Sequence, residues 1–440
     1  MYTGLTENDK KEMLRVIGVE SPDGLFSDIP ESIRLKGTLD LPRAISEMEL
    51  SMHMDEIGFR NKSFVPFIGG GAYRHYIPAV VDQLSSRSEF YTSYTPYQAE
   101  VSQGTLVAIF EYQTMIARLT GMDISNASMY DGATALAESV FMSMRANGKK
   151  KVLVSAAVHP HYREVLKTYL WASDGIYHEV PYTRGVTDID ALRENIDGDV
   201  GSVVVQNPNF FGSIEDIAAM ATLMHERGTH CIVCVTEPVS LGILKSPGSL
   251  GADIVCGEGQ AFGNPTGFGG PLLGFLGARN EFMRRMPGRL VGKTVDAQGT
   301  EAYVLTLQAR EQHIRRDRAT SNICTNQGLC ALRAVIYLAL LGPRLRDLAR
   351  LNHELASYLR NGLIGIGFQP LFSAPYFNEF TVRHERAEDI HAAMKVKGYY
   401  SGIMMEQYYP ELKGGLLICA TEMNTKEQMD AMLTGIKEVL

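Results

Sequence analysis

Short apolar runs alternate with segments of helical periodicity between residues 131 and 277. Apolar residues in the helical segments recur three and four positions apart, as at Leu136, Val140 and Met144 and again along residues 162–170. The runs between them are almost entirely apolar, as strands buried on both faces of a sheet are; they read KVLVSAA, IYHEVPY, SVVVQ, CIVCV, DIVCG and LLGFLG. This alternation predicts an α/β fold with a mostly parallel sheet covered by helices on both faces.

The first 62 residues have a different pattern. A charged helix over about 7–17 and a Met-rich helix over about 45–57 flank the loop SPDGLFSDIPESIR. The apolar positions are too few for these residues to fold alone. We therefore expect residues 1–62 to form an arm that wraps a partner chain or the core of its own chain.

The rest of the chain is predicted to form two domains. Residues 63–342 form the large α/β domain, which is expected to be helix-rich after Gly277. A helix over 344–363, the strands NEFTVR and GLLICA, a helix near 387–396 and a last helix then predict a small α+β domain over 343–440. Thr425 and Gln428 form the capping box that opens the last helix.

Aromatic residues and glycines are concentrated in two stretches before the sheet region, FVPFIGGGAYRHYIPAV and SEFYTSYTPYQAEVSQG. They predict either a packed layer of loops or the wall of a substrate channel, because tyrosine combines an apolar ring with a polar hydroxyl. The two interpretations are equally supported by the sequence. A helix follows over about 99–119.

Charge and hydropathy exclude some functions. The formal charge of -8 and the isoelectric point near 5.8 do not favour binding of nucleic acid or of an anionic membrane. The N-terminus lacks an apolar signal core, and no apolar run approaches the roughly 20 residues of a membrane helix. A cytoplasmic protein is expected.

The cysteines predict no redox or zinc site. Most of the six lie in apolar runs, and Cys231 and Cys234, although spaced C-x-x-C, would face opposite sides of the strand CIVCV. Buried thiols are the favoured interpretation. HELAS at His353 lacks the second histidine of a zinc protease motif, so no metal site is predicted.

The loop GADIVCGEGQAFGNPTGFGGP, residues 251–271, carries the strongest chemical signal. In architectures that use pyridoxal phosphate, a loop of this type presents the lysine that forms the Schiff base. No lysine lies between Lys245 and Lys293, and Gln260 stands where the amine is expected. Glutamine forms no imine, so the loop predicts a cofactor scaffold without its covalent anchor.

Other residues predict the rest of a vestigial cofactor pocket. Gly132, Ala133 and Thr134 open a helix whose free N–H groups and hydroxyl suit an anion. His159 follows the next strand, where a ring would stack on a pyridine, although a histidine there is more often structural. After CIVCV the chain offers Thr236 and Glu237 but not the aspartate that keeps a pyridine protonated. We expect this pocket to be filled by side chains or to hold only a stray anion.

The segment GRLVGKT, residues 288–294, is similar to a nucleotide-binding P-loop. It has three residues between its glycines in place of four, and no apolar strand leads into it. A nucleotide site is therefore not predicted.

Five stretches together resemble one known family. FIGGGAYRHYIPAVV, YTPYQAEVSQG, YDGATALAE, GADIVCGEGQAFGNPTGFGGPLLGF and LQAREQHIRRDRATSNICTNQ are similar to glycine dehydrogenase (decarboxylating), the P-protein of the glycine cleavage system, and within it to subunit 1, the alpha chain of the two-subunit bacterial form. The resemblance implies an aminotransferase-like fold (pyridoxal-phosphate fold type I). It also implies an α2β2 assembly in which the beta chain, subunit 2, carries pyridoxal phosphate on its own lysine and the alpha chain binds none covalently.

In that family glycine is decarboxylated where the two chains meet, and the aminomethyl group passes to the lipoyl arm of H-protein; T-protein and L-protein act in the same pathway. The resemblance implies that this chain supplies channel wall but no proton donor or nucleophile. The residues implied are Tyr94, Tyr97 and Glu100, with Tyr73, Arg74 and His75 from the glycine-rich loop, and Thr320, Ser321 and Asn322.

Two other functions stay open. One is a self-sufficient pyridoxal-phosphate lyase or transferase that uses a lysine from elsewhere, such as Lys293. The other is a purely structural or regulatory subunit that stabilises the beta chain and never contacts substrate.

Overall fold

The computed structural model describes residues 4–91 and 94–440. Contacts divide the chain into two compact units, Met1–Lys62 and Ser63–Leu440. The division of Ser63–Leu440 into a large and a small domain stays a prediction.

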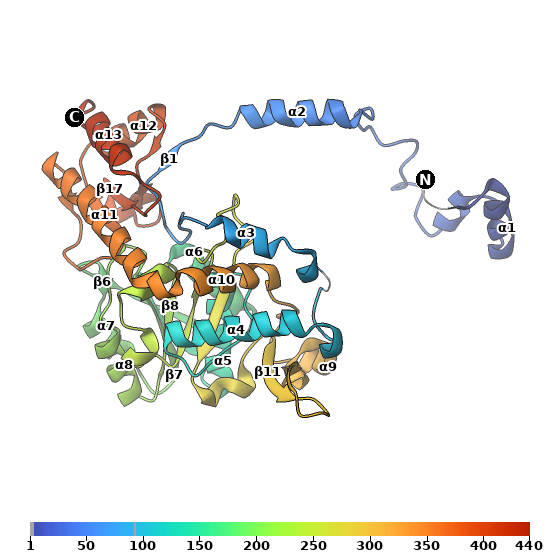
Figure 1. The fold of residues 1–440 in the computed structure, drawn as a ribbon, viewed down its shortest axis with the longest axis horizontal. Helices are drawn as coiled ribbons and strands as arrows, with labels where there is room; N and C mark the ends of the chain where they lie inside the picture. Colours follow the sequence, from blue (N-terminus) through green and yellow to red (C-terminus); the bar gives the residue numbers. More distant parts are fainter. Residues whose placement is uncertain (1–3, 92–93) are drawn as a thin grey trace. The chain divides into compact units, whose positions relative to one another are not determined.

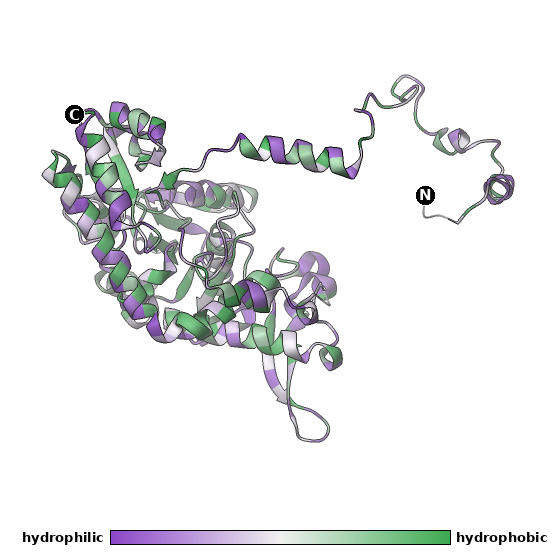
Figure 2. Cartoon of the chain, turned by 45° about the horizontal axis from the view of Figure 1, so that its top comes forward, coloured by the Kyte–Doolittle hydropathy of each residue, from purple (hydrophilic) through white to green (hydrophobic). Residues whose placement is uncertain are grey.

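The N-terminal unit contains two helices, α1 (Glu7–Ile17) and α2 (Glu47–Phe59). Thr6 and Ser46 each begin a helix with a capping box, which satisfies the first free N–H groups. None of the described residues of this unit is buried. Figure 2 shows hydrophobic residues along α2, and Met48, Met52 and Phe59 are among the exposed ones.

A seven-stranded sheet forms the centre of the second unit. The five strands β9, β8, β7, β3 and β4 pair in parallel, and β10 pairs antiparallel with both β9 and β2, so the predicted mostly parallel sheet is confirmed. The order across the sheet is β2 (Ile124–Ser125), β10 (Gly274–Ala278), β9 (Ile254–Glu258), β8 (His230–Val235), β7 (Val200–Gln206), β3 (Lys151–Ser155) and β4 (Ile176–Val180).

Helices cover both faces of this sheet because both faces are apolar. Figure 1 shows α4 (Gln103–Thr120) and α10 (Gly328–Leu341) crossing in front of the strands, and α8 (Ile217–Glu226) contributes to the same core cluster. On the other face, α5 (Gly132–Asn147) and α6 (Pro160–Ala172) pack against the sheet.

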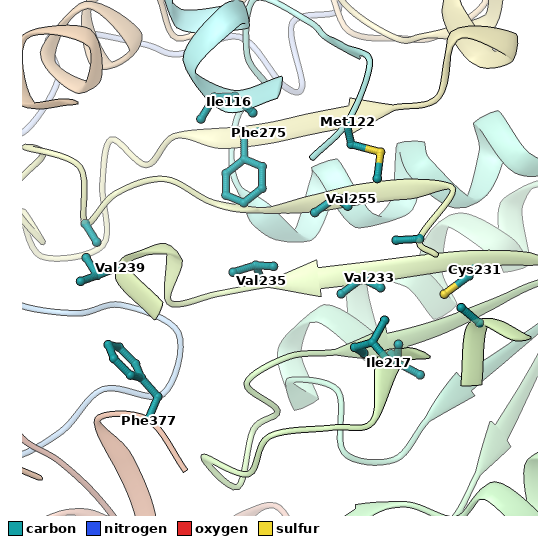
Figure 3. Packing of buried hydrophobic residues seen from close by; sticks show 14 of the residues in the cluster. Ile116, Met122, Ile217, Cys231, Val233, Val235, Val239, Val255, Phe275 and Phe377 are labelled. Atoms are coloured by element: carbon teal, nitrogen blue, oxygen red, sulfur yellow. The ribbon is translucent and has the colours of Figure 1, made fainter. Parts of the chain in front are cut away.

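Alternate residues of β8 enter different cores. Cys231 and Val235 belong to the cluster that also contains Phe275, shown in Figure 3, whereas Cys234 belongs to the cluster on the opposite face. The two thiols are free and buried on opposite faces, which confirms the predicted arrangement. Burial raises the pKa of the Cys231 thiol, so it stays protonated.

The prediction of a helix-rich chain after Gly277 is wrong for residues 290–306. These residues form a hairpin of β11 (Leu290–Val295) and β12 (Glu301–Thr306). Tertiary contact decides this structure, because the Gln113 side chain of α4 donates to the Val291 carbonyl at 3.0 Å and accepts its N–H at 2.9 Å.

Residues 345–440 contain a four-stranded antiparallel sheet with helices. The sheet order is β13 (Gln369–Pro370), β14 (Glu379–Arg383), β17 (Gly415–Cys419) and β16 (Ile403–Met404). The helices are α11 (Leu345–Gly365), α12 (Ala387–Val396) and α13 (Lys426–Lys437), and the predicted capping box of Thr425 and Gln428 is present.

The remaining elements are short. They are β1 (Val65–Pro66), which pairs with β15 (Tyr399–Tyr400), the hairpin of β5 (Tyr182–Thr183) and β6 (Val186–Thr187), and the helices α3 (Ala79–Ser85), α7 (Ile189–Asn195) and α9 (Gln312–Arg315).

The helical stretch Gly328–Gly365 is long and apolar enough to cross a membrane by length and composition alone. The sequence had predicted no such stretch. In the structure it consists of α10 and α11, separated by a 3-10 turn at Gly342–Arg344. Ala334 and Tyr337 of α10 are buried in the core beside the sheet, so packing inside the protein accounts for its apolar character.

Candidate functional site

Two carboxylates occupy the N-terminus of α5, where the sequence predicts an anion site. Asp131 caps the helix, since its Oδ1 accepts the Thr134 N–H at 2.8 Å. Glu258, at the end of β9, accepts the Gly132 N–H through Oε2 at 3.0 Å. Burial raises the pKa of Glu258 to about 7, against three backbone N–H donors that lower it. The free donors expected at Gly132 and Thr134 are therefore already engaged.

Gln260 is buried, and both the nitrogen and the oxygen of its side-chain amide are hydrogen-bonded. Its Nε2 donates to the Asn264 carbonyl at 2.6 Å, and its Oε1 accepts the Tyr73 N–H at 3.1 Å. The backbone N–H of Gln260 donates to Glu258 at 3.0 Å. The side chain at the predicted lysine position thus holds a segment nearly 190 residues earlier in the chain.

That segment is residues 69–76, which we call the glycine loop, and it covers His159. The His159 Nε2 donates to the Gly70 carbonyl at 2.7 Å, and Nδ1 accepts the His161 N–H at 3.1 Å. Gly71 has φ +101°, and a Cβ there would lie 2.8 Å from the imidazole. Burial lowers the pKa of His159 to about 4, so the ring is neutral. The glycine loop lies directly against the predicted stacking ring.

His75 of the glycine loop binds two glutamates. Its ring nitrogens donate to Glu237, which follows β8, at 3.0 Å and to Glu422, which follows β17, at 2.9 Å. Burial alone lowers the pKa of His75, but the charges and hydrogen bonds of Glu237 and Glu422 outweigh it and raise the pKa to about 10. His75 is therefore an imidazolium at neutral pH.

Glu379 of β14 also holds the glycine loop through two hydrogen bonds. It accepts the Gly70 N–H at 2.7 Å and the Tyr73 hydroxyl at 2.9 Å. Burial raises the pKa of Glu379 to about 7. Tyr73 and His75 are buried by these contacts, whereas Arg74 between them is exposed.

Covalent pyridoxal phosphate does not fit these residues. Gln260 supplies no amine, Glu258 stands at the helix N-terminus, and the glycine loop lies against His159. None of Gln260, Glu258 and His159 lines any of five cavities of about 280–810 Å³ in the described part of the chain. Among the described residues, no group of three or more His, Cys, Asp or Glu side chains is arranged so that it could hold a metal ion.

A second group of predicted site residues gathers around Arg289. This arginine is 1% exposed and donates to Glu311 at 2.6 Å, to the Cys324 carbonyl at 2.6 Å and to the Tyr97 hydroxyl at 2.9 Å. Its guanidinium also lies 4.9 Å from the centre of the Tyr97 ring. Arg289 thus joins Tyr97 to the segment 311–324, which contains the predicted Thr320, Ser321 and Asn322.

The surface beside this group is aromatic and open. Tyr94 is 80% exposed, Tyr97 is 51% exposed, and Glu100 is also exposed. A cavity of about 280 Å³ lies beside Tyr94 and is lined further by Ile109, Asn326 and Leu329. Tyr73 and His75 belong to the separate, buried contacts of the glycine loop.

The sequence interpretation missed Arg289, Glu258, Glu379 and Glu422. Arg289 lies in GRLVGKT, the segment similar to a P-loop, and no local pattern marks it as buried. Of the four, Glu258 could most readily have been identified from the sequence, because it ends a buried apolar strand two residues before Gln260.

The family model of the glycine cleavage system P-protein matches residues 1–436. The chain is 49% identical over 436 residues to the probable glycine dehydrogenase (decarboxylating) subunit 1 of Carboxydothermus hydrogenoformans, covering 98% of each chain. It is 50% identical over 440 residues to the same subunit of Geobacillus kaustophilus, covering 99% of this chain and 98% of that protein.

Solved structures agree with these relatives. A crystal structure of glycine decarboxylase (P-protein) of the glycine cleavage system in inhibitor-bound form superposes with a TM-score of 0.89 at 44% identity, covering 100% of both chains. A NifS-like protein, at 16% identity and a TM-score of 0.64 over 86% of this chain, shares the fold alone, the pyridoxal-phosphate fold type I that the sequence predicted. The chain belongs to the glycine cleavage system P-protein family.

Proposed function

We propose that the chain is the cofactor-free alpha subunit of a cytoplasmic glycine decarboxylase, assembled as α2β2 with a subunit 2 that carries pyridoxal phosphate. The pair decarboxylates glycine and passes the aminomethyl group to the lipoyl arm of H-protein, in a pathway with T-protein and L-protein. The observation that carries the proposal is Gln260 at the lysine position, in a chain that matches subunit 1 relatives from end to end.

The chain contributes to the partner's site through its aromatic surface. Tyr94 and Tyr97 are exposed residues that a partner could contact, and Arg289 fixes Tyr97 through a hydrogen bond and a cation–π contact. Apolar rings with polar tips suit a passage that admits a long lipoyl-lysine arm. Fixed geometry also suits substrate positioning, because side chains anchored by buried partners lose little entropy on binding.

A self-sufficient pyridoxal-phosphate enzyme is the less favoured alternative. Lys293, the lysine considered for it, is exposed on β11 and pairs with Glu301. Lys293 takes no part in the hydrogen bonds of Gln260 or His159 described above.

The test combines substitution with an exchange assay. Tyr97→Ala and Glu100→Ala are made in the full chain, which is purified with its partner subunit. Glycine–bicarbonate exchange is measured for each chain alone and for both together. The expected result is exchange only by the pair, with α2β2 assembly kept and exchange lowered at least tenfold in Tyr97→Ala.

Trp171→Ala is the control, because Trp171 is an 84% exposed aromatic on α6 outside the predicted contributors. Unchanged exchange in both site variants would favour a purely structural subunit. Exchange by this chain alone would refute the proposal.

A further inference from the structure

We propose that the glycine loop, residues 69–76, is a built-in replacement for the cofactor of this fold. It closes the pocket so completely that a lysine restored at position 260 would still not bind pyridoxal phosphate. The inference concerns the residues of this chain and does not depend on which partner the chain has.

At the phosphate position, two acidic side chains are already present. Asp131 and Glu258 both accept N–H groups from the first turn of α5, at 2.8 Å and 3.0 Å. A phosphate placed there would lose those donors and meet two carboxylates at close range. Like charges at such a distance disfavour ionisation of both groups. The helix N-terminus attracts anions in general, but here its Gly132 and Thr134 donors already bind acidic side chains.

At the ring position, backbone replaces the pyridine. The carbonyl of Gly70 accepts from His159, and Gly71 lies so close to the imidazole that even a methyl group would clash with it. Tyr162 and Phe210 surround the same ring, each with its centroid 4.9 Å from that of His159. These contacts leave no gap beside the imidazole for a second aromatic ring.

At the position of the acid that would hold the pyridinium, the His75 imidazolium takes the place of the cofactor's ring nitrogen. Glu237 follows the strand that would supply the acid, and its Oε2 accepts from His75 at 3.0 Å and from the Asn378 amide at 3.1 Å. Glu237 and His75 are both almost fully buried. Removing His75 would leave Glu237 and Glu422 without their counter-charge, so the glycine loop is held in place electrostatically.

The side chains of the glycine loop alternate in direction. Tyr73 and His75 are buried, whereas Arg74 is exposed and Tyr76 is 57% exposed. The Tyr76 N–H donates to Glu422 at 2.7 Å, and Thr421 donates to the Arg74 carbonyl at 2.7 Å. These hydrogen bonds to the glycine loop therefore also fix the backbone of its two exposed residues, Arg74 and Tyr76, on the surface.

Hydrogen exchange of the full-length chain tests the closed pocket directly. The N–H groups of Gly70, Tyr73 and Tyr76 are expected to exchange on the order of 100-fold more slowly than in an unstructured chain, with or without added pyridoxal phosphate. Peptides from residues 27–45, which are exposed and outside helices, serve as the fast-exchanging internal reference. Fast exchange of the glycine loop, or exchange altered by pyridoxal phosphate, would overturn the proposal.

The variant Gln260→Lys provides the second test. The full-length variant is incubated with pyridoxal phosphate, reduced with borohydride and weighed by intact mass spectrometry beside Gln260→Met, which has similar length but no amine. Equal labelling of the two variants is expected, with any label on surface lysines only. A phosphopyridoxyl group mapped to position 260 would contradict the inference while leaving the proposed function of the natural chain intact.

Discussion

Single residues in this protein act mainly by holding other residues in place. Gln260 has no covalent chemistry, yet both ends of its amide are bonded, one of them to the glycine loop. His75 illustrates the same principle with charge, because a buried imidazolium is favourable only between carboxylates. The contacts of Gln260 and His75 therefore form a structural centre of this chain.

Replacing His75 with glutamine is expected to lower the free energy of unfolding by about 3–5 kcal/mol, since two buried carboxylates lose their counter-charge. In the natural chain the folded pKa of about 10 lies above the ordinary value of 6.5. The contribution of His75 is therefore complete below pH 6.5 and is lost as the pH rises through 10. Urea unfolding across this range measures both effects.

Arg74→Gln is the matched control, because Arg74 is the exposed neighbour in the same loop, and a change within about 0.5 kcal/mol is expected. Equal stability of His75→Gln and Arg74→Gln would contradict the assigned role of His75.

At the scale of elements, tertiary contact decides where local pattern is ambiguous. The hairpin of β11 and β12 packs on α4 through Val291 and Leu305, and Gln113 pairs with the backbone of Val291. Arg289 lies directly before β11, so the position of this hairpin also fixes the contact with Tyr97. The hairpin is thus a support for the aromatic surface.

Gln113→Met is expected to destabilise the chain by about 2 kcal/mol, because it leaves the buried N–H and carbonyl of Val291 without partners. Thermal unfolding measures the loss, and hydrogen exchange of residues 290–306 locates it. Glu111→Met, an exposed change two residues earlier on α4, is the control and should have little effect. A loss no larger than that of the control would show that Gln113 does not hold the hairpin.

At the scale of the whole molecule, the N-terminal unit has apolar side chains but no core. None of its described residues is buried, and large apolar side chains are exposed along its length. Such surface is typical of protein interfaces. The match to the family model covers residues 1–436 and therefore includes this unit.

The triple variant Met48→Ser, Met52→Ser and Phe59→Ser is expected to weaken assembly with the partner subunit at least tenfold, because it removes apolar contact area from α2. Sedimentation of the mixed subunits measures the assembly. The thermal unfolding of Ser63–Leu440 should be unchanged, as these side chains contribute nothing to its core. Assembly at the natural strength would exclude α2 from the interface.

Local pattern in the sequence was sufficient for the α/β alternation, the buried thiols of Cys231 and Cys234 and the capping box of α13. It also determined that position 260 offers no amine. These features depend on residue type and short-range periodicity, which are written directly in the chain.

Only the tertiary structure decided which side chains surround Gln260 and His75. Tyr73 is hydrogen-bonded to Gln260, His75 is hydrogen-bonded to Glu237 and Glu422, and Arg289 is hydrogen-bonded to Tyr97. Such pairs carry no periodic signal, because a side chain's partner across hundreds of residues depends on how the layers pack. Burial then makes each contact obligatory, since a buried polar group without a partner is costly.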